Sequence, residues 1–319
     1  MKIKKNYIYA GIALIVLIVI ASFYFYTVKK GQAFNGQDVA WLVYKDGTLY
    51  YPSSRGEIKF RRDNYSQTSE LSVSKVVYQS NGANIYGLLV LPKKISGQLP
   101  GVVLLPGAGV SKESELGIAM KISGLGAAVL TIDQRGVGET GGYFPDLDQD
   151  YASFVNSKEP YQHLVIYDAL RAYDLLYSAP FVDPDRIIMA GESLGGRIAI
   201  ITTAIDSHIH GVLVISSAGI HFTKGNDPVK DTFIKSIDAD HYIASISPRR
   251  LVMIHNINDK NIPIQSAVQT YLKANEPKGI FLVNDTACNH GYCDSMYPAL
   301  VQGLASLDAV KVNGTVGVK

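Results

Sequence analysis

Charged residues are scarce in this sequence. Asp, Glu, Lys and Arg make up 18% of its 319 residues, and the net charge is only +2. It has neither a basic stripe with interleaved aromatic residues nor a block of like charge. This argues against a nucleic-acid partner and against a charged interaction tail. Fixed-period repeats and low-complexity tracts are also missing. The length and the 47% of apolar residues suffice for one large α/β domain with an appendage.

The longest apolar run lies near the N-terminus and contains no charge. Residues 7–28 read YIYAGIALIVLIVIASFYFYTV, and a helix that crosses a bilayer needs roughly 20 apolar residues. Tyrosines at both ends are typical of interfacial anchors. The alternative, a cleaved signal peptide, has an apolar core of roughly 7–15 residues before a small-x-small cleavage site. Because this run is longer and no Ala-x-Ala follows it, we predict an uncleaved transmembrane anchor within residues 1–30.

Lysines on the two sides of this run predict its orientation. Lys2, Lys4 and Lys5 precede it together with the amino terminus, whereas only Lys29 and Lys30 follow it. Positive charge is enriched on the cytoplasmic side of membrane segments. We therefore expect the N-terminus inside the cell and all residues after 30 outside the cytoplasm.

Residues 31–69 are predicted to connect the anchor to the main domain. Residues 39–44 and 48–51 flank Asp46-Gly47, a pattern that predicts a hairpin. This hairpin is expected to have a structural role, packed on the main domain or on the membrane surface.

From residue 70 to residue 319, apolar strands alternate with helical patterns. Eight strands are predicted at 71–78, 85–91, 101–105, 127–132, 186–190, 212–215, 251–254 and 280–283, with helices at 112–125, 161–177, 197–204 and 297–309. Strands that alternate with helices favour a mainly parallel sheet covered by helices on both faces.

Ser193 is the candidate nucleophile. A serine hydroxyl needs a neighbouring base to remove its proton, and it must be presented without steric cover. A sharp strand-to-helix turn presents it, and such a turn needs small residues on both sides of the serine. Gly191, Gly195 and Gly196 meet this need, directly after the mostly apolar strand at 186–190. A plain turn with a capping serine is the alternative.

Chain order selects the acid and the base. In hydrolases with this turn, the acid and then the histidine follow the serine. Of seven histidines, only His290 follows both a suitable acid and a later strand. Asp259 comes soon after the strand at 251–254, where a loop can direct it toward an imidazole. Asp285 and Asp294 are the alternatives, but their closeness to His290 in sequence favours surface turns.

Two backbone amides are the candidate oxyanion donors. The tetrahedral intermediate of acyl transfer carries an oxyanion that needs preorganised N–H groups. We expect one from Leu194, after the nucleophile. The second is expected from the turn Gly107-Ala108-Gly109, with Ala108 as first choice and Gly109 as the alternative.

Residues 70–312 resemble the α/β-hydrolase superfamily, particularly its dienelactone-hydrolase-like and prolyl-oligopeptidase-like members. The matching stretches, in the order of that family, are LPGVVLLPGAG, TIDQRGVGET, YDALRAYDLL, VDPDRIIMAGESLGGRIA, LVMIHNINDKNIP and NHG. The resemblance implies an α/β-hydrolase fold and a site-framing role for the turn Asp133-Gln134-Arg135-Gly136. Where many relatives have His-Gly, this chain has Pro106-Gly107, which preserves a backbone donor. Glu192 is interpreted as a variant position.

Cys288 and Cys293 lie on either side of His290. Outside the cytoplasm two cysteines often pair, and a disulfide here would hold the histidine loop. Free thiols are the main alternative. A metal site of Cys288, His290 and Cys293 has only three ligands and would remove the base from catalysis.

The pattern as a whole predicts a serine hydrolase that cleaves an acyl bond, most simply an ester of a small molecule, without a cofactor or a metal. A peptidase acting on short peptides is the closest alternative. The segment at 217–250 is too short for a large lid, which favours an open site and an esterase. A membrane-tethered domain that only binds a ligand is the second class of function.

Overall fold

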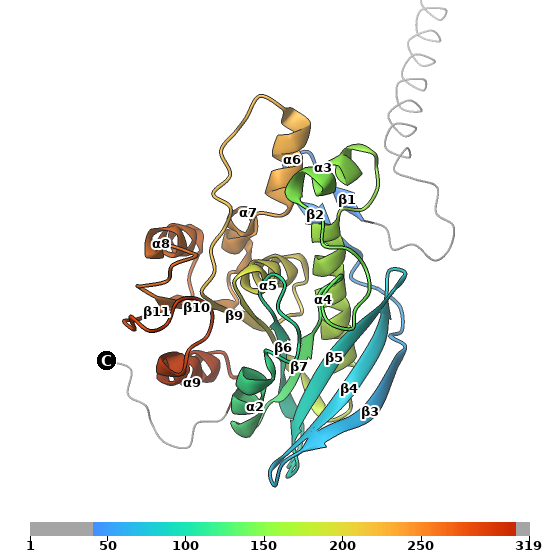
Figure 1. The fold of residues 1–319 in the computed structure, drawn as a ribbon, viewed down its shortest axis with the longest axis vertical. Helices are drawn as coiled ribbons and strands as arrows, with labels where there is room; N and C mark the ends of the chain where they lie inside the picture. Colours follow the sequence, from blue (N-terminus) through green and yellow to red (C-terminus); the bar gives the residue numbers. More distant parts are fainter. Residues whose placement is uncertain (1–40, 311–319) are drawn as a thin grey trace, which may run out of the picture.

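The computed structural model describes residues 41–310, and a nine-stranded sheet forms its centre (Figure 1). The strand order is β11-β10-β9-β8-β6-β7-β5-β4-β3. The bounds are Phe60–Gln67 (β3), Leu71–Ser80 (β4), Ala83–Pro92 (β5), Leu99–Leu105 (β6), Ala128–Ile132 (β7), Val182–Glu192 (β8), Gly211–Ile215 (β9), Arg250–Asn256 (β10) and Lys278–Val283 (β11). Strands β6 to β11 pair in parallel, whereas β3, β4 and β5 form an antiparallel meander that joins β7.

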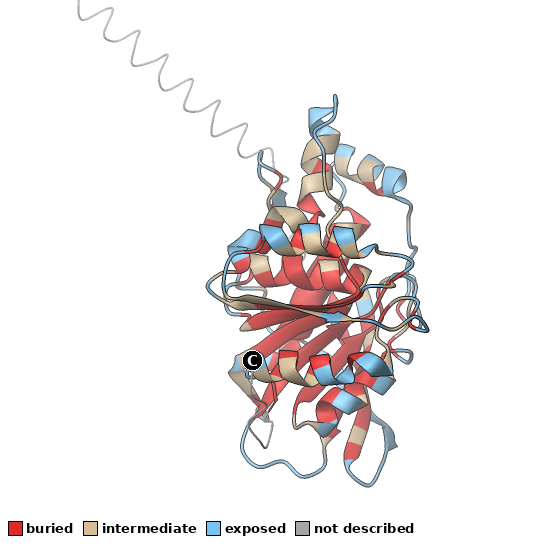
Figure 2. Ribbon diagram, turned by 90° about the vertical axis from the view of Figure 1, so that its left-hand side faces the viewer, coloured by how far each residue is buried: buried red, intermediate tan, exposed pale blue. Residues whose placement is uncertain are grey.

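Helices cover both faces of the sheet, as Figure 2 shows from its edge. Helices α2 (Leu116–Gly124) and α9 (Tyr297–Ser306) pack on one face, and α4 (Tyr161–Tyr177), α5 (Leu194–Ile205) and α8 (Ile264–Lys273) pack on the other. The central strands are continuous apolar runs because both of their faces are buried; β6 and β9 are buried at every residue. The predicted mainly parallel sheet between two helical layers is confirmed.

The predicted number of eight strands is wrong, because β3 adds a ninth. All eight residues of β3 are exposed, and the strand is attached to the sheet only through its antiparallel pairing with β4. Its sequence FRRDNYSQ has no apolar face for a period-two pattern to reveal. The sheet therefore begins at Phe60, inside the predicted connecting segment at 31–69.

The predicted hairpin is formed by β1 (Leu42–Val43) and β2 (Leu49–Tyr50), which pair antiparallel. Asp46 accepts a hydrogen bond from the Thr48 amide at 2.9 Å, and Gly47 has a φ of 98° that suits the turn. Leu49 is buried, and its amide donates to the Tyr242 hydroxyl at 2.7 Å. Of the two predicted positions, the hairpin is thus packed on the main domain.

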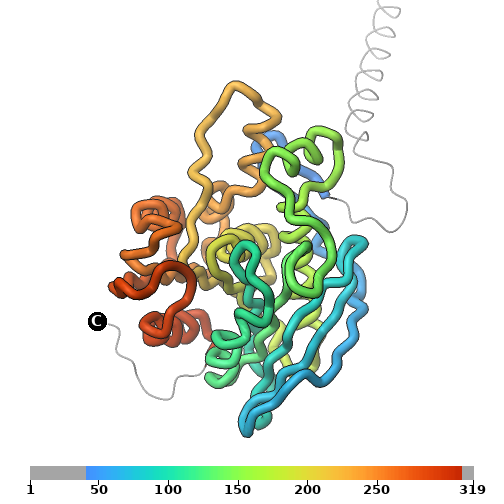
Figure 3. Tube along the Cα trace, in the orientation of Figure 1, coloured from blue at the N-terminus to red at the C-terminus, as the bar shows by residue number. Residues whose placement is uncertain are grey.

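Five short elements connect the strands and the long helices. They are α3 (Leu147–Val155), α6 (Pro228–Ser236), α7 (Ala239–Tyr242) and the 3-10 turns η1 (Ile243–Ile246) and η2 (Asp294–Met296). Figure 3 shows the chain leaving β9, rising to α6 beside α3 and returning toward the sheet. The segment at 217–250 thus forms two short helices and one turn.

The predicted membrane anchor at residues 7–28 lies outside the described residues. Among residues 41–310, no helix combines the length and the apolar composition needed to cross a membrane.

Candidate active site

Ser193 lies at the sharp turn between β8 and α5. Its φ of 50° and ψ of −117° are strained for a residue with a side chain, and its amide donates to the Ile215 carbonyl at 3.0 Å. A Cβ at Gly191 would lie 2.4 Å from the Gly195 backbone, and one at Gly195 would lie 2.1 Å from the Leu105 carbonyl oxygen. Only glycine therefore fits at positions 191 and 195, where β8 and α5 approach each other closely. This close approach presents the serine at the edge of the sheet.

His290 and Asp259 meet at the same edge, from the loops after β11 and β10. The Nδ1 atom of His290 lies 3.0 and 2.9 Å from the two carboxylate oxygens of Asp259. Asn261 and Ile262 donate their amides to Asp259 Oδ1, each at 2.9 Å. Burial opposes ionisation, but the Ile262 amide, His290 and the Asn261 amide hold the pKa of Asp259 below its usual value. The carboxylate thus stays charged and orients the imidazole.

The two alternative acids have other contacts. Asp294 is exposed and forms an ion pair with Lys121 at 3.0 Å. Asp285 accepts the Ala287 amide at 2.8 Å in a local turn. Asp259 is therefore the carboxylate that His290 contacts.

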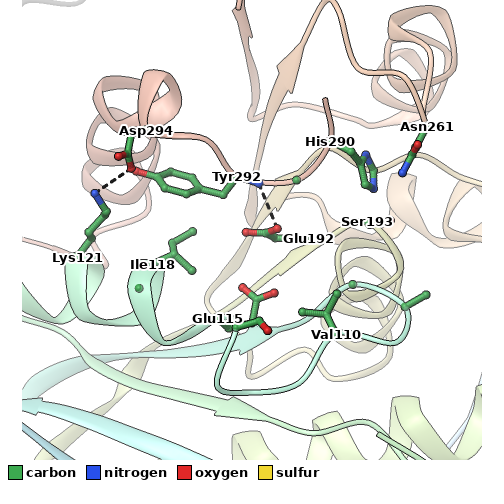
Figure 4. Close-up of a pocket in the computed structure, with 15 residues that line it drawn as sticks. Val110, Glu115, Ile118, Lys121, Glu192, Ser193, Asn261, His290, Tyr292 and Asp294 are labelled. Atoms are coloured by element: carbon green, nitrogen blue, oxygen red, sulfur yellow. Dashed lines mark hydrogen bonds and ion pairs between the residues drawn. The ribbon is translucent and has the colours of Figure 1, made fainter. Parts of the chain in front are cut away.

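Two cavities open on either side of Ser193. The histidine-side cavity, about 530 Å³, is lined by Ser193, His290, Glu115, Glu192 and Tyr292 among others (Figure 4). The leucine-side cavity, about 430 Å³, has a mainly apolar wall that includes Phe144, Leu147, Leu194, Ile220 and Ile262. Ser193 and Ala108 line both cavities, so the serine stands at their junction.

The turn after β6 lies directly beside the serine. A Cβ at Gly107 would be 3.5 Å from the Ser193 Cβ. The Val110 amide closes the turn on the Gly107 carbonyl at 3.2 Å, and Gly109 has a φ of 71°. The predicted donor Ala108 is thus held next to Ser193 by a turn that requires glycine.

Buried polar side chains hold this turn. Gln134 donates to the Pro106 carbonyl at 2.8 Å. Lys112 is fully buried, and its Nζ donates to Asp133 Oδ2 at 2.7 Å, while its amide donates to Asp133 Oδ1 at 2.8 Å. Asp133 and Gln134 belong to the turn for which the resemblance implied a site-framing role. No pattern in the sequence around Lys112 marks it as part of the site, because its contact with Asp133 forms only in the folded chain.

Lys112→Met is expected to lower the free energy of unfolding by about 3–5 kcal/mol, because it leaves the buried Asp133 charge without its cation. Urea unfolding at neutral pH measures this loss. Lys75→Met is the matched control. Lys112 and Lys75 both form an ion pair with Glu139, but Lys75 does so at the surface, so this variant should lose less than about 1 kcal/mol of stability. Equal losses in the two variants would contradict the role of Lys112.

Two acidic side chains face each other in the histidine-side cavity. Glu192 Oε2 accepts the Tyr292 amide at 3.1 Å, and Glu115 approaches from the start of α2 (Figure 4). Burial raises the pKa of Glu192. Burial and then the charge of Glu192 raise the pKa of Glu115 to about 8. Glu115 carried no signal in the sequence, because its partner is 77 positions away.

Cys288 and Cys293 are joined by a disulfide. Asn256 Nδ2 also donates to the Cys288 carbonyl at 2.6 Å, which ties the loop to the end of β10. Within residues 41–310, no group of three His, Cys, Asp or Glu side chains is arranged to hold a metal ion. Of the three states considered for these cysteines, the structure has the disulfide, which closes the loop that carries His290.

The strand order, the strained serine turn and the loops that meet above it define an α/β hydrolase. The family model of the acetyl xylan esterases (AXE1) matches residues 53–224, and the chain belongs to this family.

Solved structures share this fold, and a curated sequence matches part of the chain. The acetyl xylan esterase of Paenibacillus sp. R4 superposes with a TM-score of 0.66 at 22% identity, over 81% of this chain and 91% of that one. The acetyl xylan esterase 1 of Thermoanaerobacterium sp. JW/SL YS485 gives a TM-score of 0.63 at 15% identity, over 79% and 89%. The protein YfhR of Escherichia coli O157:H7 is 31% identical over 142 residues, 43% of this chain and 50% of YfhR. The chain thus spans about half the length of this curated relative.

Proposed function

We propose that this protein hydrolyses carboxylic esters of small molecules through an acyl-enzyme formed on Ser193. The observation that carries the proposal is that His290, which is paired with Asp259, lines one cavity together with the strained Ser193. The names of the family and of its structural neighbours support an ester as the scissile group. A peptide bond remains the alternative substrate to test.

The chemistry follows from the hydrogen bond at Nδ1. Because Nδ1 faces the Asp259 carboxylate, it carries the ring proton, and Nε2 is free to act as the base. Ser193 Oγ attacks the carbonyl carbon while its proton moves to Nε2. When the bond to the alcohol breaks, His290 gives that proton to the leaving oxygen. Water then repeats the sequence on the acyl-enzyme and releases the acid.

Backbone amides stabilise the charge that develops on the carbonyl oxygen. Leu194 follows the nucleophile at the start of α5, and Ala108 lies on the adjoining turn. Two such preorganised donors bind the oxyanion more strongly than the neutral carbonyl. Gly109 is the alternative donor to Ala108.

The test of hydrolysis uses a fluorophosphonate probe together with two chromogenic substrate series. The purified protein is expected to react with the probe at Ser193. It is also expected to cleave p-nitrophenyl esters faster than aminoacyl p-nitroanilides. Faster amide cleavage would favour the peptidase, and a folded protein that neither reacts nor hydrolyses would favour a binding domain.

We also propose that residues 7–28 anchor the catalytic domain on the outer side of the membrane. A disulfide between Cys288 and Cys293 supports this location, because disulfides persist in oxidising compartments.

Alkylation of the denatured protein from membrane fractions tests the proposed location. Without reductant neither cysteine should react, whereas after reduction both should. In cells freed of their cell wall or outer membrane, with the plasma membrane intact, added protease is expected to degrade the catalytic domain. Two reactive thiols without reductant, or release of the protein by alkaline carbonate, would contradict the proposed anchor and location.

A further inference from the structure

The two cavities receive different parts of an ester, given the proposed function. His290 delivers its proton to the leaving oxygen, so the leaving alcohol must lie against the wall that His290 forms. That wall belongs to the histidine-side cavity, which His290, Gly291 and Tyr292 line. The leucine-side cavity, with Leu194 and Ile262, then receives the acyl group.

Glu115 is an isolated buried carboxyl group in the histidine-side cavity. Its residue is only 4% exposed, yet within residues 41–310 no hydrogen bond or ion pair reaches its side chain. Three other buried carboxylates contact a cation: Asp133 contacts Lys112, Asp168 contacts Arg135 and Asp206 contacts Arg55. Buried charges in proteins are normally paired in this way. Among the described residues, Glu115 has no such cation.

No side chain of the described cavity wall supplies that cation. Lys121 lines the same cavity, but its ammonium group forms an ion pair with Asp294 at 3.0 Å. The neighbour that Glu115 does have is Glu192, a second carboxyl group, which adds negative charge. Figure 4 shows Glu115 directed toward Glu192 across the cavity, so the space between them is bordered by two acids.

We propose that Glu115 and Glu192 form a subsite for an organic cation carried by the leaving alcohol, so that the preferred substrates are esters of amino alcohols. The proposal rests on the proposed ester hydrolysis. Ile118 and Val110 line the same cavity and offer apolar contact to the carbon atoms that surround an ammonium nitrogen. Within residues 41–310 no group of three His, Cys, Asp or Glu side chains is arranged to hold a metal ion, which favours an organic cation over a metal ion here.

The charge of this subsite depends on pH. Because the pKa of Glu115 is raised to about 8, its carboxylate is mostly protonated at pH 6 and mostly ionised at pH 9. A cation favours the ionised form, so affinity for it rises with pH. The other charged or titratable groups in the cavity wall around Glu115 are Glu192 on β8, His290 on the loop after β11, and the Lys121–Asp294 pair on α2 and η2.

The experiment compares two esters of the same shape, acetylcholine and 3,3-dimethylbutyl acetate, which differ in one positive charge. Both are titrated calorimetrically at pH 6 and pH 9 into the full chain with Ser193→Ala, so that neither is consumed. The preference for acetylcholine, expressed as the ratio of the two Kd values, is expected to rise about tenfold between these pH values. This corresponds to a drop of about one unit in the pKa of Glu115 on binding.

Two further variants, each combined with Ser193→Ala, show which residue causes the rise in preference with pH. Glu115→Gln should remove most of the rise, and any remainder belongs to Glu192 and His290. Glu70→Gln, which removes an exposed carboxylate outside the cavity, should keep the rise. An equal rise in the Glu115 variant, or no preference for acetylcholine at either pH, would overturn the proposal. Hydrolysis of 3,3-dimethylbutyl acetate by the unchanged protein is measured separately, and its failure would count against ester hydrolysis instead.

Discussion

Replacing Ser193 with alanine is expected to lower kcat for ester hydrolysis by roughly a millionfold, the scale seen when a serine hydrolase loses its nucleophile. Without Oγ no acyl-enzyme forms, and the His290 base has no hydroxyl to activate. The substitution should leave folding intact, because Ser193 Oγ makes no hydrogen bond that the turn requires; the turn is held by the Ser193 amide on Ile215. Turnover of p-nitrophenyl acetate and labelling by a fluorophosphonate measure the loss.

A second serine provides the control for this experiment. The hydroxyl of Ser178, at the end of α4, donates to the Leu175 carbonyl at 3.0 Å, and the residue lies outside both cavities. Ser178→Ala should keep turnover and labelling. Unchanged labelling in the Ser193 variant would show that the probe reacts elsewhere and would refute the assignment of the nucleophile.

Asp259→Asn is expected to lower kcat by about 10⁴-fold. The asparagine amide can donate to Nδ1, which then gives up its proton, so Nε2 becomes protonated and can no longer accept the serine proton. The shape of the side chain is kept, and its oxygen can still accept the Asn261 and Ile262 amides. The protein should therefore fold normally, and steady-state kinetics at neutral pH should isolate the chemical loss.

The same substitution at Asp285 tests whether Asp259 or Asp285 is the catalytic acid. Asp285 follows β11 and bonds to the Ala287 amide in an exposed turn. Asp285→Asn should keep kcat within about a factor of three, in line with the small effects of most surface changes. If this variant lost more activity than the Asp259 variant, the acid would have been assigned to the wrong loop.

The sequence predicted the fold best for strands that are buried on both faces, because such strands appear in the sequence as continuous apolar runs. Continuous apolar runs located β6 and β9 correctly, because parallel strands under two helical layers need apolar residues at every position. Strand β3 escaped prediction because an exposed edge strand is held by backbone pairing and imposes no pattern on its side chains. The predicted helix at 112–125 begins only at Leu116, because Lys112 is drawn into the network with Asp133.

Within the site, the sequence by itself determined the serine turn. The crossing of β8 and α5 around Ser193 is a local geometry, and its steric demands appear directly as Gly191, Gly195 and Gly196. Chain order was enough to name Asp259 and His290, although 31 residues separate them. Only the tertiary structure decided what surrounds them. The burial of Lys112 against Asp133 and the isolation of Glu115 beside Glu192 depend on contacts between segments distant in the chain, and solvation and charge are set by those contacts.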